Sequence, residues 1–245
     1  MKGLILAAGR GSRLGPHTAD KPKSLLEING KSLIRRNLEN FQKVGIDQVI
    51  LVLGYLKEML EEEIYSYFPK EFVKILYNPD YTRGSGSTLM CASEELKGSF
   101  LVVESDLLYD AKILQRMIDA DTDHGLTVGR FHNGRKEIKV YLENGCIANP
   151  HWGLEYNDDA IGDWVGFTKL SDSSSAHLKK MLEDTNPNQG KELNYEDFIA
   201  KLFKVFPFKP IYINDLPWIE IDNYDDFKRG ESEICPRIDN PNRNQ

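Results

Sequence analysis

The stretch that decides the fold is Gly3-Leu4-Ile5-Leu6-Ala7-Ala8-Gly9-Arg10-Gly11-Ser12-Arg13-Leu14-Gly15. Its apolar beginning is short enough for a buried strand and too short to span a membrane. The remainder is a glycine-rich loop with two arginines, and Lys21 and Lys23 follow it. Glycines let backbone N–H groups approach a ligand, and clustered cations repel one another unless they are solvated or face an anion. A buried strand that runs into such a loop is typical of a polyphosphate site.

Two familiar phosphate-binding motifs do not fit this loop. A P-loop closes with Gly-Lys-Ser/Thr, but Leu14 and Gly15 stand at the corresponding positions. The dinucleotide fingerprint needs a third glycine where Leu14 stands and an acid at the tip of the second strand, where Val49–Tyr55 offers none. The missing acid argues against a dehydrogenase. The glycines alone leave a simple turn after a strand as an open alternative.

A longer pattern narrows the choice. Residues 6–14, with Thr18, Pro22-Lys23 and Leu25-Leu26, resemble the signature of the nucleotidyltransferase superfamily with the GT-A-like fold. The resemblance implies an α/β, Rossmann-like fold with a mostly parallel central sheet. It also implies an enzyme that condenses a nucleoside triphosphate with a phosphorylated small molecule and releases pyrophosphate.

Composition limits the other classes of function. The 245 residues can form one large α/β domain, and the net charge of −7 argues against general nucleic-acid binding. Three unevenly spaced cysteines predict neither a disulfide framework nor a metal cluster, which favours a reducing compartment. We find no targeting or membrane segment in the sequence, and we therefore expect a cytoplasmic protein without a membrane partner.

The order of patterns along the chain predicts one domain over residues 1–230. Helical and apolar segments alternate up to about residue 126: strands at 48–53, 73–77 and 100–103, helices at 33–44, 57–68 and from Ser87 or Thr88 to Leu96. An alternating segment at 136–142 with a turn at 143–145 then predicts a small β insert, and 162–169 a further strand. Helices at 174–182 and 195–204 and a strand at 210–214 follow. Residues 231–245 read as a polar tail or the start of a linker.

The resemblance assigns the nucleotide site to two glycine loops. The basic residues have charge-neutralising roles: Lys23 over the α-phosphate and Arg13 at the leaving β- and γ-phosphates. The second loop, Arg83–Thr88, is either the segment that reads the base or merely a turn with a helix cap. The expected nucleotide-binding residues are Leu6, Ala7, Ala8, Gly9, Gly11, Ser12, Gly86 and Ser87.

Acidic residues follow two of the predicted strands. Ligands of open α/β sheets bind beyond the carboxyl ends of strands, which makes Asp106 a site candidate, although a lone aspartate there can also be a cap or a turn acid. Asp106 and Asp222 match the superfamily's metal-binding aspartates, and this implies Mg²⁺, which prefers hard oxygen ligands. Glu220 is two residues from Asp222 and shares its strand face.

The segment at 152–167 contains residues that we expect to contact the acceptor. Aromatic residues lie among acids at 152–167, and ring faces and carboxylates both favour an ammonium group, although each ring taken singly is better explained as core. The segments 103–110 and 165–171 resemble cytidylyltransferases that activate phosphocholine or 2-aminoethylphosphonate. The expected partners are therefore CTP and a small phosphorylated or phosphonate acceptor, with acceptor contacts from Tyr109, Trp152, Trp164 and Glu220. A sugar-1-phosphate or inositol-phosphate nucleotidyltransferase and a nucleotide-sensing regulatory module remain as alternatives.

Overall fold

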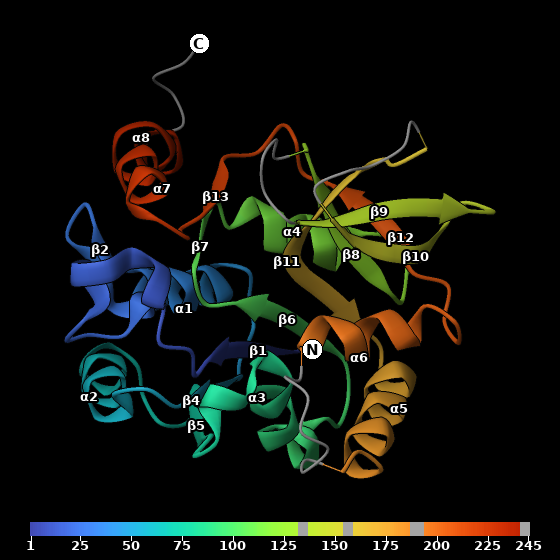
Figure 1. The fold of residues 1–245 in the computed structure, drawn as a ribbon, viewed down its shortest axis with the longest axis horizontal. Helices are drawn as coiled ribbons and strands as arrows, with labels where there is room; N and C mark the ends of the chain where they lie inside the picture. The colour runs from blue at the N-terminus through green and yellow to red at the C-terminus, as the bar shows by residue number, and fades with distance from the viewer. Residues whose placement is uncertain (132–136, 154–158, 187–193, 241–245) are drawn as a thin grey trace.

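The computed structural model describes residues 1–131, 137–153, 159–186 and 194–240, apart from the side chains of residues 12, 16, 137 and 149–153. Its centre is a nine-stranded sheet (Figure 1). Along the sheet the strands are β10 (Cys146–Gly153), β9 (Glu137–Glu143), β11 (Gly162–Leu170), β6 (Phe100–Glu104), β1 (Lys2–Ala7), β4 (Val49–Leu53) and β5 (Val73–Tyr77). β8 (Gly125–Gly129) pairs with β11, and β12 (Lys209–Tyr212) pairs with β8.

The middle of the sheet is parallel. β1 lies between β6 and β4, with Leu4 beside Val102 and Ile50, and all three strands run in the same direction. Most of their residues are apolar on both faces, because helices cover both sides. The predicted α/β fold with a mostly parallel centre is confirmed.

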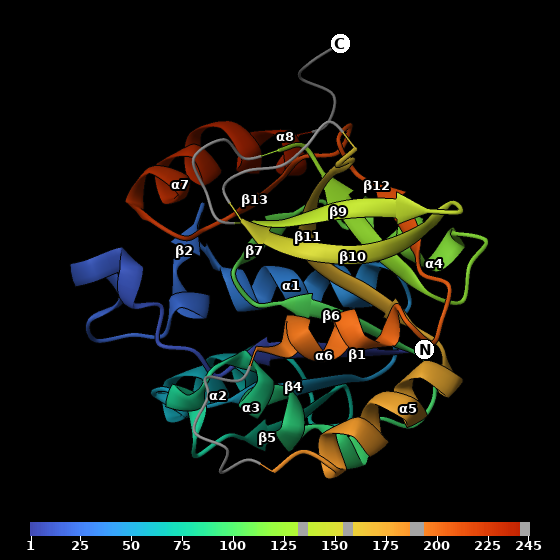
Figure 2. The same ribbon diagram turned by 45° about the vertical axis from the view of Figure 1, so that its right-hand side comes forward.

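Helices form a layer on each face of the sheet, as Figure 2 shows from a second side. One face carries α1 (Leu33–Lys43), α2 (Lys57–Tyr67) and α4 (Lys112–Asp119), and the other carries α3 (Ser85–Cys91), α5 (Asp172–Glu183) and α6 (Tyr195–Leu202). Because neighbouring side chains of a strand point to opposite faces, Ile5 packs with the first layer and Leu6 with the second. None of the helices in the described ranges is both long enough and apolar enough to cross a bilayer.

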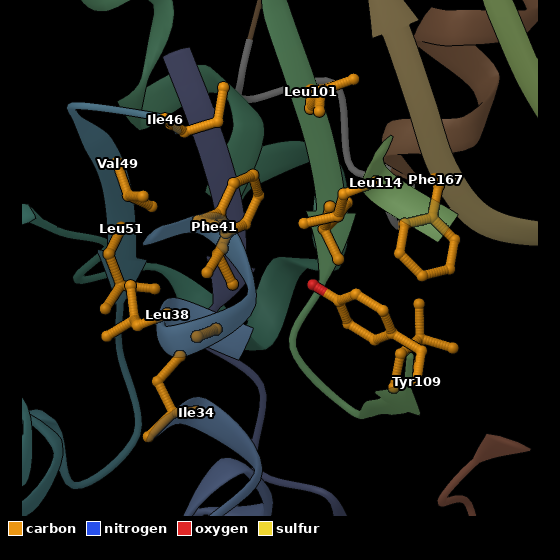
Figure 3. Packing of buried hydrophobic residues seen from close by; sticks show 14 of the residues in the cluster. Ile34, Leu38, Phe41, Ile46, Val49, Leu51, Leu101, Tyr109, Leu114 and Phe167 are labelled. Atoms are coloured by element: carbon orange, nitrogen blue, oxygen red, sulfur yellow. The ribbon is translucent and has the colours of Figure 1, made fainter. Parts of the chain in front are cut away.

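The packing under α1 shows why this helix forms where the apolar spacing predicted it. Ser32 caps the helix by accepting a hydrogen bond from the Arg35 N–H, and Gly45 ends it with a φ of 76°. Leu38 and Phe41 then point from the helix into the core, where Figure 3 shows them among side chains from the strands. The helix is therefore fixed by both its cap and its buried face.

Short segments connect these layers around the first loop and the second glycine loop. They are the 3-10 turns η1 (Ser12–Thr18), η2 (Lys23–Leu25), η3 (Tyr81–Arg83) and η4 (Ser93–Glu95), and the two-stranded sheet of β2 (Glu27–Ile28) and β3 (Lys31–Ser32). α3 begins at Ser85, earlier than predicted, because Gly84 turns the chain with a φ of 92°. It also ends at Cys91, before the predicted end at Leu96, and η4 follows.

The predicted β insert is a hairpin that extends the central sheet at its edge. β9 and β10 pair around the two-residue turn Asn144-Gly145, and both residues have positive φ values, 52° and 72°. Asparagine and glycine suit this turn because they tolerate left-handed backbone. The hairpin therefore belongs to the main sheet, through the pairing of β9 with β11.

The expectation of a polar tail from residue 231 is wrong for the residues that the structure describes. After β13 (Trp218–Glu220) the chain forms α7 (Tyr224–Arg229), the π-helical turn η5 (Gly230–Ile234) and α8 (Cys235–Asp239). Ile234 and Cys235 are buried in a third apolar cluster, and Asp239 pairs with the buried Arg36 at 3.1 Å. These two apolar residues were too few to show a period in the sequence. Residues 241–245 lie outside the described part.

A buried ion pair joins the hairpin to the sheet. Lys139 of β9 lies opposite Asp163 of β11, and its Nζ is 2.6 Å from Asp163 Oδ1, with both side chains 1% exposed. We expect Lys139→Met to lower the free energy of unfolding by about 3–5 kcal/mol, since it leaves a buried carboxylate without this lysine. Urea denaturation measures the change. The double variant Lys139→Met/Asp163→Leu should recover most of the loss, and an equally unstable double variant would show that the pair itself is not the cause.

Candidate active site

A cleft of about 290 Å³ lies at the carboxyl ends of β1 and β6. Its walls come from the first loop, the second glycine loop, the end of β6, the start of α6 and Asp222, two residues after the end of β13 (Trp218–Glu220). The lining residues are Leu6, Ala8, Gly9, Gly11, Arg13, Lys23, Ser24, Tyr81, Gly84, Ser85, Thr88, Glu104, Ser105, Asp106, Tyr195, Glu196 and Asp222.

Lys23 is at the centre of the charged part of this cleft. Its Nζ donates hydrogen bonds to Asp106 Oδ2 at 2.7 Å and to Asp222 Oδ1 at 2.9 Å. Burial opposes the charge of Lys23, but the carboxylates of Asp106, Asp222 and Glu220 outweigh it and raise the pKa of Lys23 above its ordinary value. Lys23 is therefore a fixed cation at any physiological pH.

Gly11 allows the first loop to pass Lys23 closely. A Cβ on Gly11 would lie 2.6 Å from the Lys23 Cβ, and the φ of Gly11 is 69°. Both the space and the backbone conformation therefore require glycine at this position.

Backbone contacts bring the two aspartates together. β13 pairs antiparallel with β7 (Leu107–Tyr109), and the Ile221 N–H donates to the Asp106 carbonyl at 3.0 Å. Asp226, in the first turn of α7, accepts from the Asp222 N–H at 3.1 Å. The chain thus holds Asp106 and Asp222 on either side of Lys23 although they are far apart in sequence.

Arg13 makes a second ion pair at the outer side. Its Nη1 is 2.7 Å from Asp222 Oδ2, but the Arg13 side chain is 76% exposed, whereas that of Asp222 is 10% exposed. An exposed arginine on a loop can change partner at little cost. Arg13 is therefore positioned to move from Asp222 to an incoming anion.

Carboxylates outnumber cations here. Glu104, Asp106 and Glu220 have one ligand oxygen each, and these oxygens all lie within 4.8 Å of one another. Burial, together with the neighbouring acids, raises the pKa of Glu104 and of Glu220. Among the described residues that line the cleft, only Lys23 and Arg13 are cations. The arrangement is suited to a further positive charge.

The buried Oδ1 of Asp106 strengthens this conclusion. It has no hydrogen-bond partner within the described parts of the chain, while Oδ2 is bound by Lys23. A buried carboxylate oxygen without a partner is costly unless a ligand satisfies it. Asp106 thus offers a hard oxygen ligand of the kind that Mg²⁺ takes, and Asp222 can offer Oδ2 once Arg13 leaves it; carboxylate donors of this kind fit that ion.

The start of α6 connects both walls of the cleft. Ser85 Oγ accepts from the Tyr195 N–H at 2.9 Å and donates to Glu196 Oε2 at 3.2 Å. The Tyr195 hydroxyl donates to Glu104. Burial raises the pKa of Glu196 to about 7. Glu104, Tyr195 and Glu196 were not among the predicted site residues.

One of these residues had a usable signal in the sequence. Glu104 ends a buried strand, and this position marks it as a candidate in the same way as Asp106. Tyr195 and Glu196 begin a helix whose first turn is acidic, which any helix N-terminus favours. The sequence around α6 does not indicate that it docks against Ser85.

The predicted nucleotide-binding residues are only partly in the cleft. Leu6, Ala8, Gly9 and Gly11 line it, whereas Ala7 points to the opposite face of the sheet. In the second loop, Gly86 and Ser87 are buried and do not line the cleft, and Gly84, Ser85 and Thr88 do. Both predicted loops therefore line the cleft, although some of the predicted residues do not. The side chain of Ser12 lies outside the described part.

The predicted acceptor-binding residues that the structure describes lie in different parts of the fold. Tyr109 is a correction: it is 2% exposed and packs edge-on against Phe167 in the core, as Figure 3 shows. Trp164 is also buried and does not line the cleft, although its ring packs against Tyr195, which does. Glu220 joins the acidic group beside Lys23. The Trp152 side chain lies outside the described part.

The acids of the insert that the structure describes do not line the cleft either. Asp163 is paired with Lys139 inside the sheet, and the expectation that it favours an ammonium group is wrong. Glu155, Tyr156 and Asp158 lie outside the described residues. The carboxylates at the cleft instead come from strand ends and from α6.

Comparison with known proteins finds a matching family and several relatives. Residues 3–161 match the family described as the MobA-like NTP transferase domain. The bifunctional IPC transferase and DIPP synthase of Aquifex aeolicus is 27% identical over 239 residues, which cover 94% of this chain and 51% of that protein. The choline-phosphate cytidylyltransferase of Streptococcus pneumoniae is 34% identical over 164 residues, which cover 65% of this chain and 60% of that protein. The chain thus spans about half to three-fifths of these relatives.

A solved structure shows the same fold. The inositol-1-phosphate CTP transferase from T. maritima superposes with a TM-score of 0.81 and 18% sequence identity, covering 98% of this chain and 96% of that one. At this identity the likeness supports the architecture alone.

Proposed function

The chain belongs to the MobA-like NTP transferase family, and on this premise we propose that it transfers CMP from CTP to a small, positively charged phosphate or phosphonate, 2-aminoethylphosphonate or phosphocholine. It is a nucleotidyltransferase, and pyrophosphate is the second product. The observation that carries the proposal is the placement of Lys23 and Arg13 among acids at the end of β1 and β6. This arrangement supplies both cations for phosphates and carboxylates for a metal ion.

The reaction is a substitution at the α-phosphorus. An oxygen of the acceptor's phosphate or phosphonate forms a bond to that phosphorus, and the bond from it to the β-phosphate oxygen breaks. The attacking oxygen is largely ionised near pH 7, because phosphate esters lose their second proton with a pKa of about 6. A general base is therefore unnecessary, and the enzyme's task is to bring two anions together.

The cations of the cleft perform this task. Lys23 is held rigidly by Asp106 and Asp222, and it lies where the α-phosphate and the incoming oxygen meet in our proposal. Arg13 leaves Asp222 and neutralises the β- and γ-phosphates, which its exposure allows. Asp106 and Asp222 would hold Mg²⁺, which would neutralise charge on the phosphate oxygens. The backbone of the first loop lines the nucleotide.

The excess of acidic residues over cations at the cleft supports a positively charged acceptor. Glu104 and Glu196 line the cleft, and Glu220 lies beside Asp106, in addition to the two aspartates that would hold the metal. A sugar has only hydroxyl groups to offer to these carboxylates, whereas an ammonium group neutralises one of them. The name of the relative from S. pneumoniae also points to a choline-phosphate acceptor.

A matrix of four nucleoside triphosphates against phosphocholine, 2-aminoethylphosphonate, inositol-1-phosphate and glucose-1-phosphate tests the proposal by pyrophosphate release. We expect product with CTP and one of the two cationic acceptors, and none with glucose-1-phosphate. Glu196→Gln should raise the KM of the acceptor more than that of CTP, because only the acceptor carries an ammonium group that this carboxylate attracts. Efficient turnover of a sugar phosphate or inositol phosphate, without turnover of either cationic acceptor, would refute the proposed acceptor. The assignment as a nucleotidyltransferase would stand.

The second candidate is a protein that binds a nucleotide without turnover. The ion pairs of Lys23 with Asp106 and Asp222 argue for chemistry, since a sensor needs no metal ligands beside its phosphate-binding lysine. Nucleotide binding without pyrophosphate release across the whole matrix would favour the sensor.

A further inference from the structure

We infer that Asn37, a buried asparagine of α1, is a positioning residue for the two aspartates of the active site. Its carboxamide donates to the backbone carbonyl of Leu107, the residue after Asp106. By holding β7, Asn37 also holds the paired strand β13, which leads to Asp222. The inference rests on the proposed function, since it concerns the proposed metal ligands of the same site. Asn37 itself does not line the cleft.

The small sheet of β7 and β13 is the first step. It is separate from the central sheet and only three residue pairs long. Two strands of this kind are only marginally stable by themselves. Asp106 immediately precedes β7, and Asp222 follows β13 by two residues. The contacts that hold this small sheet in place therefore also determine where the two carboxylates lie.

The outer edge of β7 is the second step. In the described part of the chain β7 pairs with β13 alone, and the Asp106 carbonyl accepts from the Ile221 N–H on that side at 3.0 Å. Because the hydrogen-bonding groups of successive residues in an antiparallel strand point to alternate sides, the carbonyls of Leu107 and Tyr109 point away from β13. Both residues are buried, and a buried carbonyl without a donor is costly. These two carbonyls therefore need donors from another element.

α1 supplies both donors. Asn37 Nδ2 donates to the Leu107 carbonyl at 3.1 Å. Asn40 lies one helical turn later on the same face and donates from Nδ2 to the Tyr109 carbonyl at 2.9 Å. The two asparagines are 0% and 4% exposed, so water does not compete for these bonds. One helix thus takes the place of a second neighbouring strand along β7.

Asn37 carries a cost that the packing of α1 alone does not explain. Its Nδ2 also donates to the Leu33 carbonyl at 2.9 Å, and two carbonyl partners require the nitrogen on this side of the amide. Oδ1 is then buried and has no hydrogen-bond partner among the residues that the structure describes. A leucine would avoid this cost and would favour the helix more than asparagine does. The bond to β7 is what the amide supplies and an apolar side chain cannot.

The two asparagines hold opposite ends of β7. Asn37 binds the carbonyl directly after Asp106, at the end of the strand that receives the Ile221 N–H. Asn40 binds the other end, next to Asp110, whose N–H donates at 3.1 Å to the chain just before β13. The same substitution at the two positions therefore separates an effect on the aspartates from a general loss of packing between α1 and β7.

Native-state amide hydrogen exchange, measured on the protein without metal or nucleotide, tests the positioning. The variant is Asn37→Ser, because its single hydroxyl hydrogen can keep the bond to the Leu33 carbonyl while the shorter side chain loses β7. We expect the Ile221 amide to exchange about tenfold faster, relative to the amides of β4, which report global unfolding. Asn40→Ser should accelerate the Asp110 amide instead.

Binding of Mn²⁺ in the presence of CTP, followed by electron paramagnetic resonance, tests the consequence for the site. Asn37→Ser should weaken Mn²⁺ binding about tenfold, the lower end of the effect of residues that orient metal ligands from behind. Asn40→Ser, the same change in the same helix, should alter the Mn²⁺ affinity much less. Circular dichroism establishes that the variants are folded, and Asn37→Ala is measured in the same way if Asn37→Ser is not.

Three results would overturn the inference. The first is an Ile221 exchange rate in Asn37→Ser that is unchanged relative to β4, and the second is an unchanged Mn²⁺ affinity in that variant. The third is an equal loss of Mn²⁺ affinity in both variants, which would indicate a general structural role. If the exchange rates changed as expected but the wild-type protein bound no Mn²⁺, the proposed metal ligands would be refuted and the positioning role of Asn37 would stand.

Discussion

Replacement of Lys23 by alanine is expected to lower kcat by a factor of about 10²–10³, the effect of losing one preorganised group that stabilises transition-state charge. The physical reason is its position. Lys23 is buried between Asp106 and Asp222, and these two carboxylates hold its charge at one fixed place in the cleft. Pyrophosphate release under saturating CTP and acceptor measures the loss.

The controls separate charge from packing. Lys23→Arg keeps the positive charge but not the size, and it should recover only part of the rate. Lys43→Ala removes an exposed lysine at the end of α1 and should leave the rate unchanged. If Lys23→Ala raised only the KM for CTP, Lys23 would be a nucleotide-binding residue and our role for it would be wrong.

The second large effect is expected at the aspartates. Asp106→Ala and Asp222→Ala should each abolish measurable pyrophosphate release, because each removes one proposed oxygen ligand of Mg²⁺ and one partner of Lys23. The lost ligand should also weaken binding of Mn²⁺, used as a spectroscopic substitute for Mg²⁺ and followed by electron paramagnetic resonance in the presence of CTP. Chelation of the metal should stop the wild-type reaction in the same assay.

An acidic neighbour supplies the matched control. Asp225 is exposed in the first turn of α7, three residues after Asp222, and Asp225→Ala should keep both turnover and Mn²⁺ binding. Near-normal turnover in Asp106→Ala or Asp222→Ala would remove that residue from the site. If a variant lost turnover but bound Mn²⁺ normally, the replaced aspartate would act by holding Lys23 and not as a metal ligand.

The parallel half of the fold could be predicted from the sequence because its signals are local. The apolar run before Gly9, the capped helix after Ser32 and the strand at 73–77 each have their own pattern, and each forms where expected. The loops at Gly11 and Gly84 were found for the same reason, since their backbone conformations need glycine.

The acceptor side could not be predicted in this way because its contacts join distant segments. An aromatic residue has the same local pattern in a core and in a pocket, and Tyr109 is in the core. Asp163 reads as a free acid until β9 places Lys139 opposite it. The docking of α6 on Ser85 depends on the whole antiparallel half between them.

The bond from Ile221 to Asp106 also determines when the protein becomes competent during synthesis. The ribosome releases Arg13, Lys23 and Asp106 long before Asp222, and at 5–20 residues per second the interval from residue 106 to residue 222 lasts roughly 6–23 s. During this interval β1, β4, β5 and β6 can already pair, but Lys23 has only one of its two carboxylate partners. Translation therefore completes the parallel centre of the sheet first, and the second carboxylate partner of Lys23 and the α6 wall of the cleft last.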